Sequence, residues 1–206
     1  RSHPEQHLGQ HLDIELSEAG RSAAKALGRR LTGVRFDRVV SSPLKRAHET
    51  ARLVVADQEA ESEPRLVEMD YGEWEGLTYA EIDAQDGERR RAWEADPAHA
   101  PCPGGESGGD VAKRVRAWLD ELGHWHAGRL RTGDELRILA VGHSTTNRIL
   151  LCVALDVPLR AYRDRFRQEP ANLTVLQYPA PGANGARLVL ANDVSHIRGT
   201  SGDTWS

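Results

Sequence analysis

The stretch FDRVVSSPLKRA, residues 36–47, decides the fold. Its first half is typical of a buried strand, and its second half predicts a helix that begins immediately. Ser42 is suited to cap that helix, and Pro43 fits the first helical position because proline lacks the N–H that would be unpaired there. Arg46 would then lie near a helix N-terminus at the end of a strand, where backbone N–H groups favour an anion. The stretch predicts an α/β unit with a candidate phosphate or carboxylate site, although many unrelated α/β proteins place an arginine there.

Strand and helix patterns alternate through the rest of the chain. Apolar strands are expected at 34–41 and 136–141, each followed by a helix, and a closing pair of strands is expected at 172–178 and 187–192. This alternation predicts an α/β fold of three layers, α/β/α, with a mostly parallel sheet. We expect one domain over residues 1–206, ending in a polar, flexible tail at 197–206.

Helix starts are marked by residues whose side chains accept from backbone N–H groups. Ser17 and Ser107 each precede a helical apolar pattern, and Thr78 is followed three residues later by Glu81, the spacing of a capping box. Three helices are therefore predicted to begin just after positions 17, 78 and 107.

Composition excludes several classes of protein. The chain has 206 residues, a formal net charge of −4 and a mean hydropathy of −0.57. No apolar run approaches the ~18 residues of a membrane span, so no membrane partner is expected. Nucleic-acid binders are normally basic, so no nucleic-acid partner is expected for this acidic chain. Two cysteines, Cys102 and Cys152, do not form a disulfide framework, and with no signal peptide in view they favour free thiols in the cytoplasm.

Five sequence blocks resemble the histidine phosphatase superfamily, also called phosphoglycerate mutase-like. Any one of them is a weak signal, but all five occur in the family's order and at plausible spacing over roughly residues 8–198. The blocks are HLDIELSEAG at 11–20, SSPLKRAHETA at 41–51, EMDYGEWEGLT at 68–78, PGGES at 103–107 and VGH at 141–143. The resemblance implies the three-layer histidine phosphatase fold and phosphoryl transfer through a histidine.

The resemblance also implies roles for three residues. Arg46 matches the arginine that grips the phosphate, for which a guanidinium offers a planar fork of donors. Glu68 matches the proton donor and acceptor, a role that requires a raised pKa, with Glu73 and Glu75 as nearby competitors. His143 matches the second histidine, which donates to the transferring phosphoryl group.

The resemblance also implies substrate contacts at Ser144 and at the first two residues, Arg1 and Ser2. Ser144 stands where the family commonly has glycine, and its N–H can still bind phosphate. The family's nucleophile lies in an Arg-His-Gly motif after a central strand, and Arg1 and Ser2 align with the two positions after that triplet. On this alignment the nucleophile and its strand precede residue 1, and Arg1 and Ser2 bind substrate. The competing interpretation makes His3 a displaced nucleophile.

A metal site is the weaker interpretation of the first segment. His3, His7 and His11 recur at the i, i+4, i+8 spacing of one helical face, but Pro4 and Gly9 interrupt such a helix. We therefore expect no metal and no cofactor.

The sequence favours a phosphomonoester hydrolase that acts on a small phosphorylated metabolite through a phosphohistidine. A cofactor-dependent, phosphoglycerate mutase-type enzyme is the first alternative, disfavoured because mutases carry a longer insertion between the Glu68 and PGGES blocks. A non-catalytic protein that binds a phosphorylated ligand is the second, because the nucleophile is not visible in this chain. A homodimer stays open.

Overall fold

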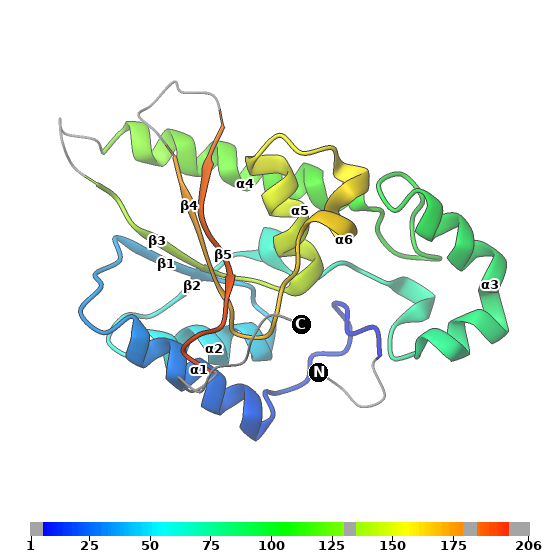
Figure 1. Cartoon of the computed structure of the whole chain (residues 1–206), viewed down its shortest axis with the longest axis horizontal. Helices are drawn as coiled ribbons and strands as arrows, with labels where there is room; N and C mark the ends of the chain where they lie inside the picture. Colours follow the sequence, from blue (N-terminus) through cyan, green and yellow to red (C-terminus); the bar gives the residue numbers. More distant parts are fainter. Residues whose placement is uncertain (1–5, 130–134, 179–184, 198–206) are drawn as a thin grey trace.

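The computed structural model describes residues 6–129, 135–178 and 185–197. Helices and strands alternate over most of this length, as the sequence predicts (Figure 1). The elements are α1 (Glu18–Arg30), β1 (Arg38–Ser41), α2 (Lys45–Val54), β2 (Glu61–Ser62), the 3-10 helices η1 (Pro64–Leu66) and η2 (Gly72–Trp74), α3 (Tyr79–Ala95), α4 (Gly108–Ala127), β3 (Ile138–Val141), α5 (Ser144–Ala154), η3 (Leu159–Ala161), α6 (Tyr162–Arg165), β4 (Leu173–Gln177) and β5 (Arg187–Asp193).

A parallel sheet of order β2-β1-β3 lies at the centre of the fold. Strand β1 pairs with β3 from Arg38 opposite Ile138 to Ser41 opposite Val141. The strand predicted over 34–41 is therefore shorter than expected at its start. Ladder pairing begins only where the N–H of Asp37 donates to the carbonyl of Arg137 at 2.8 Å.

Helices cover both faces of this sheet. Val39 packs with α1 and α2, in a core that includes Leu27, whereas its neighbour Val40 packs with Trp118 of α4. Successive side chains of a strand point to opposite faces, so the two valines separate two layers of helices. Figure 1 shows α1 and α2 on one side of the sheet and α4 and α5 on the other. The three-layer α/β/α fold is confirmed.

The predicted closing strands form a separate antiparallel pair. Strands β4 and β5 run alongside each other, with Leu176 opposite Leu188. Within the described ranges this pair shares no ladder with the parallel sheet. Of the tail predicted at 197–206, positions 198–206 lie outside the described residues.

Three of the predicted helix starts are confirmed. Ser17 accepts from the N–H of Gly20, and capping boxes are complete at Thr78 with Glu81 and at Ser107 with Asp110. None of the helices in the described segments is both long enough and apolar enough to cross a membrane.

The predicted start of α2 is wrong. The helix begins at Lys45, two residues later than a cap at Ser42 would place it. The carboxylate of Asp13 accepts from the N–H of Lys45 at 2.7 Å and so caps the helix from a distant segment. The hydroxyl of Ser42 is directed to His143 instead.

Candidate active site

Parallel pairing brings the C-terminal ends of β1 and β3 to one edge of the sheet, where ligands of α/β proteins commonly bind. The N–H of Ser42, just after β1, donates to the carbonyl of Val141 at 2.9 Å. His143 follows Val141 by two residues. The two side chains meet there, with Oγ of Ser42 2.8 Å from Nε2 of His143.

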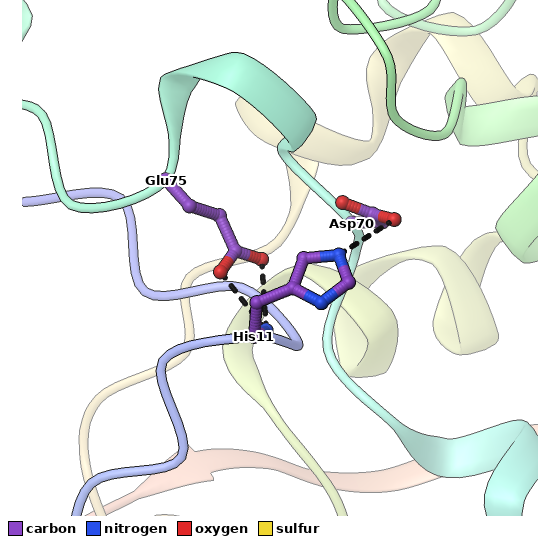
Figure 2. Close-up of side chains that lie close together, drawn as sticks. All are labelled: His11, Asp70 and Glu75. Atoms are coloured by element: carbon purple, nitrogen blue, oxygen red, sulfur yellow. Dashed lines mark hydrogen bonds and ion pairs between the residues drawn. The ribbon is translucent and has the colours of Figure 1, made fainter.

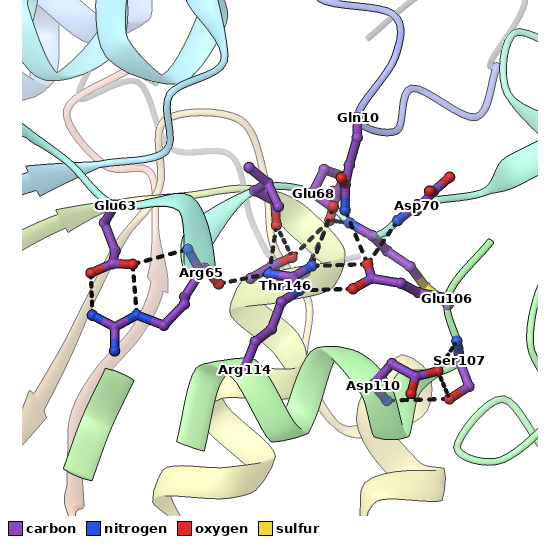
Figure 3. A network of polar contacts seen from close by, with 12 residues as sticks. Gln10, Glu63, Arg65, Glu68, Asp70, Glu106, Ser107, Asp110, Arg114 and Thr146 are labelled. Carbon is purple, nitrogen blue, oxygen red and sulfur yellow. Dashed lines mark hydrogen bonds and ion pairs between the residues drawn. The ribbon is translucent and has the colours of Figure 1, made fainter. Parts of the chain in front are cut away.

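Glu68 lies at the N-terminus of α5. Its carboxylate accepts from the N–H groups of Thr145 and Thr146 at 3.1 and 3.0 Å, and from the N–H of Met69 at 2.9 Å. His143, the N-cap residue of α5, makes no side-chain capping bond, so the carboxylate of Glu68 serves as the cap (Figure 3). An anion is thus already held where free helical N–H groups converge.

Opposing effects act on the acidity of Glu68. Burial raises the pKa of this carboxyl above its usual value, because removal from water penalises the charged form. The three backbone N–H donors and the positive charge of Arg46 act in the opposite direction, but the pKa stays raised. Glu68 has the tuning that an acid–base group needs.

Arg46, the second residue of α2, is oriented by backbone carbonyls. Its Nη2 donates to the carbonyl of Gly9 at 2.9 Å and its Nη1 to that of Leu12 at 3.1 Å. Among the described residues it forms no ion pair with a carboxylate. Burial lowers the pKa of Arg46, and the negative charge of Glu68 partly offsets that effect. The site therefore contains a fixed cation whose charge is free to meet an anionic ligand.

His143 is buried and neutral near pH 7. Burial, and then the positive charges of Arg46 and Arg114, lower the pKa of its imidazole to about 3. A neutral imidazole still carries one N–H, so it can donate one hydrogen bond to a phosphate oxygen without titrating near neutral pH.

The loop that contacts Arg46 is anchored from its other side by Glu75. The Glu75 carboxylate accepts from the N–H groups of Gln10, His11 and Leu12 at distances of 2.5 to 3.3 Å. Figure 2 shows this carboxylate against the backbone of His11, whose ring turns to Asp70. Glu75 has therefore a structural use, and Glu73 is exposed, which leaves Glu68 as the buried carboxyl of the block.

Of the histidines considered for a metal, only His7 and His11 lie among the described residues, and they have different neighbours. His7 packs edge-on against Tyr71 and Tyr79, and His3 lies outside the described residues. His11 instead lies with Asp70 and Glu75, their potential ligand atoms within 4.8 Å of one another. Because the Glu75 carboxylate is taken by backbone N–H groups, we interpret this group as a loop anchor.

A pair of charged residues braces the segment that contains Glu68. Arg114 donates to both carboxylate oxygens of Glu106, and also to the carbonyls of Arg65, Val67 and Glu68 (Figure 3). Glu106 in turn accepts from the backbone N–H of Asp70 at 3.0 Å. Residues 65–70 are thus fixed relative to α4.

Of the predicted site residues, those that the structure describes lie at the C-terminal ends of β1 and β3 and around the N-terminus of α5. Arg46 lies within electrostatic reach of both Glu68 and His143, and Ser144 is the exposed first residue of α5. Arg1 and Ser2 lie outside the described residues. Their roles, like those of the other predicted residues, stay predictions.

Sequence reasoning missed two neighbours of these groups. Ser42 was interpreted as a helix cap, and Arg114 was not singled out. The PGGES block did mark the segment of Glu106, and a search for a cationic partner about two helical turns later would have included Arg114.

Comparison with known proteins bears on this arrangement. Residues 2–193 match the sequence model of the histidine phosphatase superfamily (branch 1). The chain belongs to this superfamily. Among curated relatives, it is 40% identical over 156 residues to a bifunctional protein of Mycobacterium tuberculosis, and the match covers 73% of this chain and 40% of the relative. It is 32% identical to phosphoserine phosphatase 1 of Hydrogenobacter thermophilus, over 73% of this chain and 69% of the relative.

Solved structures of the superfamily share the fold. Mycobacterial glucosyl-3-phosphoglycerate phosphatase in complex with inorganic phosphate superposes with a TM-score of 0.82 at 31% identity, covering 94% of each chain. The α-ribazole phosphatase from Shigella flexneri gives a TM-score of 0.79 at 26% identity, covering 93% of this chain and 90% of that one. Against the bifunctional mycobacterial protein, the chain spans only 40% of the relative's length.

Proposed function

We propose that the protein containing this chain is a metal-independent phosphatase that hydrolyses the monoester of a small phosphorylated metabolite. One observation carries the proposal. A buried carboxyl with a raised pKa, Glu68, occupies the N-terminus of α5 directly beside His143. It lies within electrostatic reach of Arg46, a cation that pairs with no carboxylate in the described segments. Acid, hydrogen-bond donor and cation are the parts that transfer of a phosphoryl group from an ester oxygen requires.

Arg46 and His143 are proposed to hold the phosphoryl group. The carbonyls of Gly9 and Leu12 fix two nitrogens of the guanidinium, so its remaining N–H donors are oriented before substrate arrives. The neutral imidazole adds one N–H without a positive charge that would change near pH 7. Charge that develops on the phosphoryl oxygens therefore meets donors that need no reorganisation.

Glu68 is proposed to move the proton. As the P–O ester bond breaks, the leaving alkoxide takes the carboxyl proton of Glu68, and the phosphoryl group passes to the nucleophile. The carboxylate then accepts a proton from the attacking water, the bond to the nucleophile breaks, and inorganic phosphate leaves. A bound phosphate dianion would raise the pKa of Glu68 further by like-charge repulsion, which favours the protonated form at the first step.

The nucleophile in this proposal is the histidine that the family resemblance implies, and we assign it to no described residue. The family names support the reaction class, because relatives are named as phosphatases of phosphoserine, of glucosyl-3-phosphoglycerate and of α-ribazole phosphate. These names also show that different substrates occur within the family.

The test uses the natural protein that contains this chain, with p-nitrophenyl phosphate as substrate and EDTA present throughout. Hydrolysis, with a phosphorylated histidine detected by intact mass after rapid acid quench, is the expected result. Activity that disappears with EDTA and returns with a divalent ion would overturn the metal-independent proposal. Transfer dependent on 2,3-bisphosphoglycerate, with little hydrolysis, would indicate a mutase, and phosphate binding without turnover would indicate a non-catalytic binding protein.

A further inference from the structure

We propose that Ser42 is a positioning residue that donates its hydroxyl proton to Nε2 of His143 and so fixes the imidazole proton on Nδ1. The inference deepens the proposed function, because its catalytic meaning rests on the phosphatase assignment. The hydrogen bond itself, and its direction, do not depend on that assignment.

The contact is short, buried and held from both sides. Oγ of Ser42 lies 2.8 Å from Nε2 of His143, and the two residues are 0% and 8% exposed. Each follows a strand of the parallel pair β1 and β3, and the N–H of Ser42 is bonded to the carbonyl of Val141 at 2.9 Å. Strand pairing therefore sets the relative position of hydroxyl and ring.

The surroundings of the hydroxyl decide which group donates. Oγ of Ser42 already accepts from the N–H of Leu44 at 3.3 Å. In the described part of the chain, Nε2 of His143 is the only other partner of Oγ. If Nε2 carried the proton, Oγ would accept twice and its own proton would be left without an acceptor in a buried site, which is costly. Donation from Ser42 to Nε2 satisfies both the hydroxyl and Nε2.

The other ring nitrogen then carries the proton. Nδ1 of His143 has no hydrogen-bond partner among the described residues. Unlike the fully buried atoms that lack a partner, this nitrogen keeps some exposed surface on which a ligand oxygen could contact it. With Nε2 occupied as an acceptor, the neutral ring must present Nδ1–H. In the opposite tautomer Nδ1 would present a lone pair, which repels phosphate oxygens.

The chain supplies a matched control. Ser41 is equally buried, and its hydroxyl lies 3.3 Å from Nδ1 of His48 rather than against His143. Ser41→Ala and Ser42→Ala therefore remove the same group from adjacent positions, and only the second removes the donor to His143. Ser42→Thr keeps the hydroxyl and serves as the conservative variant.

The experiment is long-range ¹H–¹⁵N NMR of histidine-labelled protein at pH 7, with the ring signals of His143 assigned by their loss in His143→Gln. We expect a protonated Nδ1 and an unprotonated Nε2 in the wild type, Ser41→Ala and Ser42→Thr, and loss of that single tautomer in Ser42→Ala. An Nε2–H tautomer in the wild type, or an unchanged His143 spectrum in Ser42→Ala, would overturn the proposal. If Ser42→Ala does not fold, the wild-type spectrum decides alone.

A kinetic measurement separates this inference from the proposed function. For p-nitrophenyl phosphate we expect kcat/KM of Ser42→Ala to fall roughly tenfold, the worth of about one hydrogen bond, with Ser41→Ala within twofold of the wild type. Full activity of Ser42→Ala, with an altered tautomer, would show that Ser42 does not act on catalysis. A wild type without hydrolysis but with the expected tautomer would instead count against the phosphatase proposal alone.

Discussion

Arg114 and Glu106 form two parallel hydrogen bonds, from Nε to Oε1 at 3.0 Å and from Nη2 to Oε2 at 3.1 Å. The same guanidinium donates to three carbonyls of the 65–68 segment, and the same carboxylate accepts from Gln10 and from the N–H of Asp70. One ion pair thus joins α4, the acid-bearing segment and the loop against Arg46.

Removal of Arg114 should destabilise the protein strongly. Arg114→Met leaves the Glu106 carboxylate without its cation and three carbonyls without a donor, and we expect a loss of about 3 kcal/mol in the free energy of unfolding. Urea unfolding measures it, with the exposed Arg116→Met on the same helix as control. A double variant that also carries Glu106→Gln should lose less than the sum of the single changes. Strict additivity would contradict the brace.

Arg46 should be irreplaceable by lysine. A lysine carries the charge but cannot donate to the carbonyls of Gly9 and Leu12 while also presenting a fork to phosphate. We expect Arg46→Lys to weaken binding of inorganic phosphate roughly 10- to 100-fold, from about 1.5–3 kcal/mol of charge-assisted hydrogen bonding. Isothermal titration calorimetry gives the affinity, and the exposed Arg52→Lys in α2 is the matched control. Equal affinities would remove Arg46 from the site.

Glu68 should matter most for poor leaving groups. We expect Glu68→Gln to lower kcat for an alkyl phosphate monoester roughly 10²- to 10⁴-fold, and to affect p-nitrophenyl phosphate less because p-nitrophenolate leaves without a proton. Steady-state kinetics on the two substrates measure the difference. Glu73→Gln, at an exposed position of the same block, should leave both rates unchanged. An equal loss on both substrates would argue against proton donation.

The protein should become less stable as the pH is lowered below about 6.5, because burial lowers the pKa of His143 in the folded state. Its pKa is about 3 in the folded protein, lower than the 6.5 of the free group, so only the unfolded chain takes up this proton between those values. The contribution is therefore fully present above pH 6.5 and is lost on acidification, at up to about 1.4 kcal/mol per pH unit. Urea unfolding at pH 5 and pH 7 should show a weaker pH dependence for His143→Gln than for the wild type. Identical dependence in the two proteins would contradict the shift.

Patterns local in sequence predicted the fold well, and contacts distant in sequence account for what they missed. Alternating apolar segments and capping boxes indicated the layers, because periodicity and caps depend on near neighbours. The start of α2 was wrong because its cap is Asp13, 32 positions away. No feature of the helix itself reports that carboxylate.

The candidate site shows the same division. Arg46, Glu68 and His143 were predicted from motifs, and parallel pairing of β1 with β3 explains why Ser42 and His143 meet. The sequence did not show that Glu68 would occupy the N–H groups of Thr145 and Thr146, since this needs the distance between two loops. Motifs supplied the candidate residues, and their partners follow only from contacts distant in sequence.

The tethered loop at 9–12 constrains how this scaffold can diverge. Glu75 takes its N–H groups and Arg46 takes two of its carbonyls, so an inserted residue would unpair several backbone groups at once and misdirect the guanidinium. Helix α3 buries only Ile82 and Trp93 and is interrupted at Asp86, so it can lengthen, shorten or change composition cheaply. Insertions, deletions and substitutions should therefore be tolerated far better in α3 than in the loop that orients Arg46.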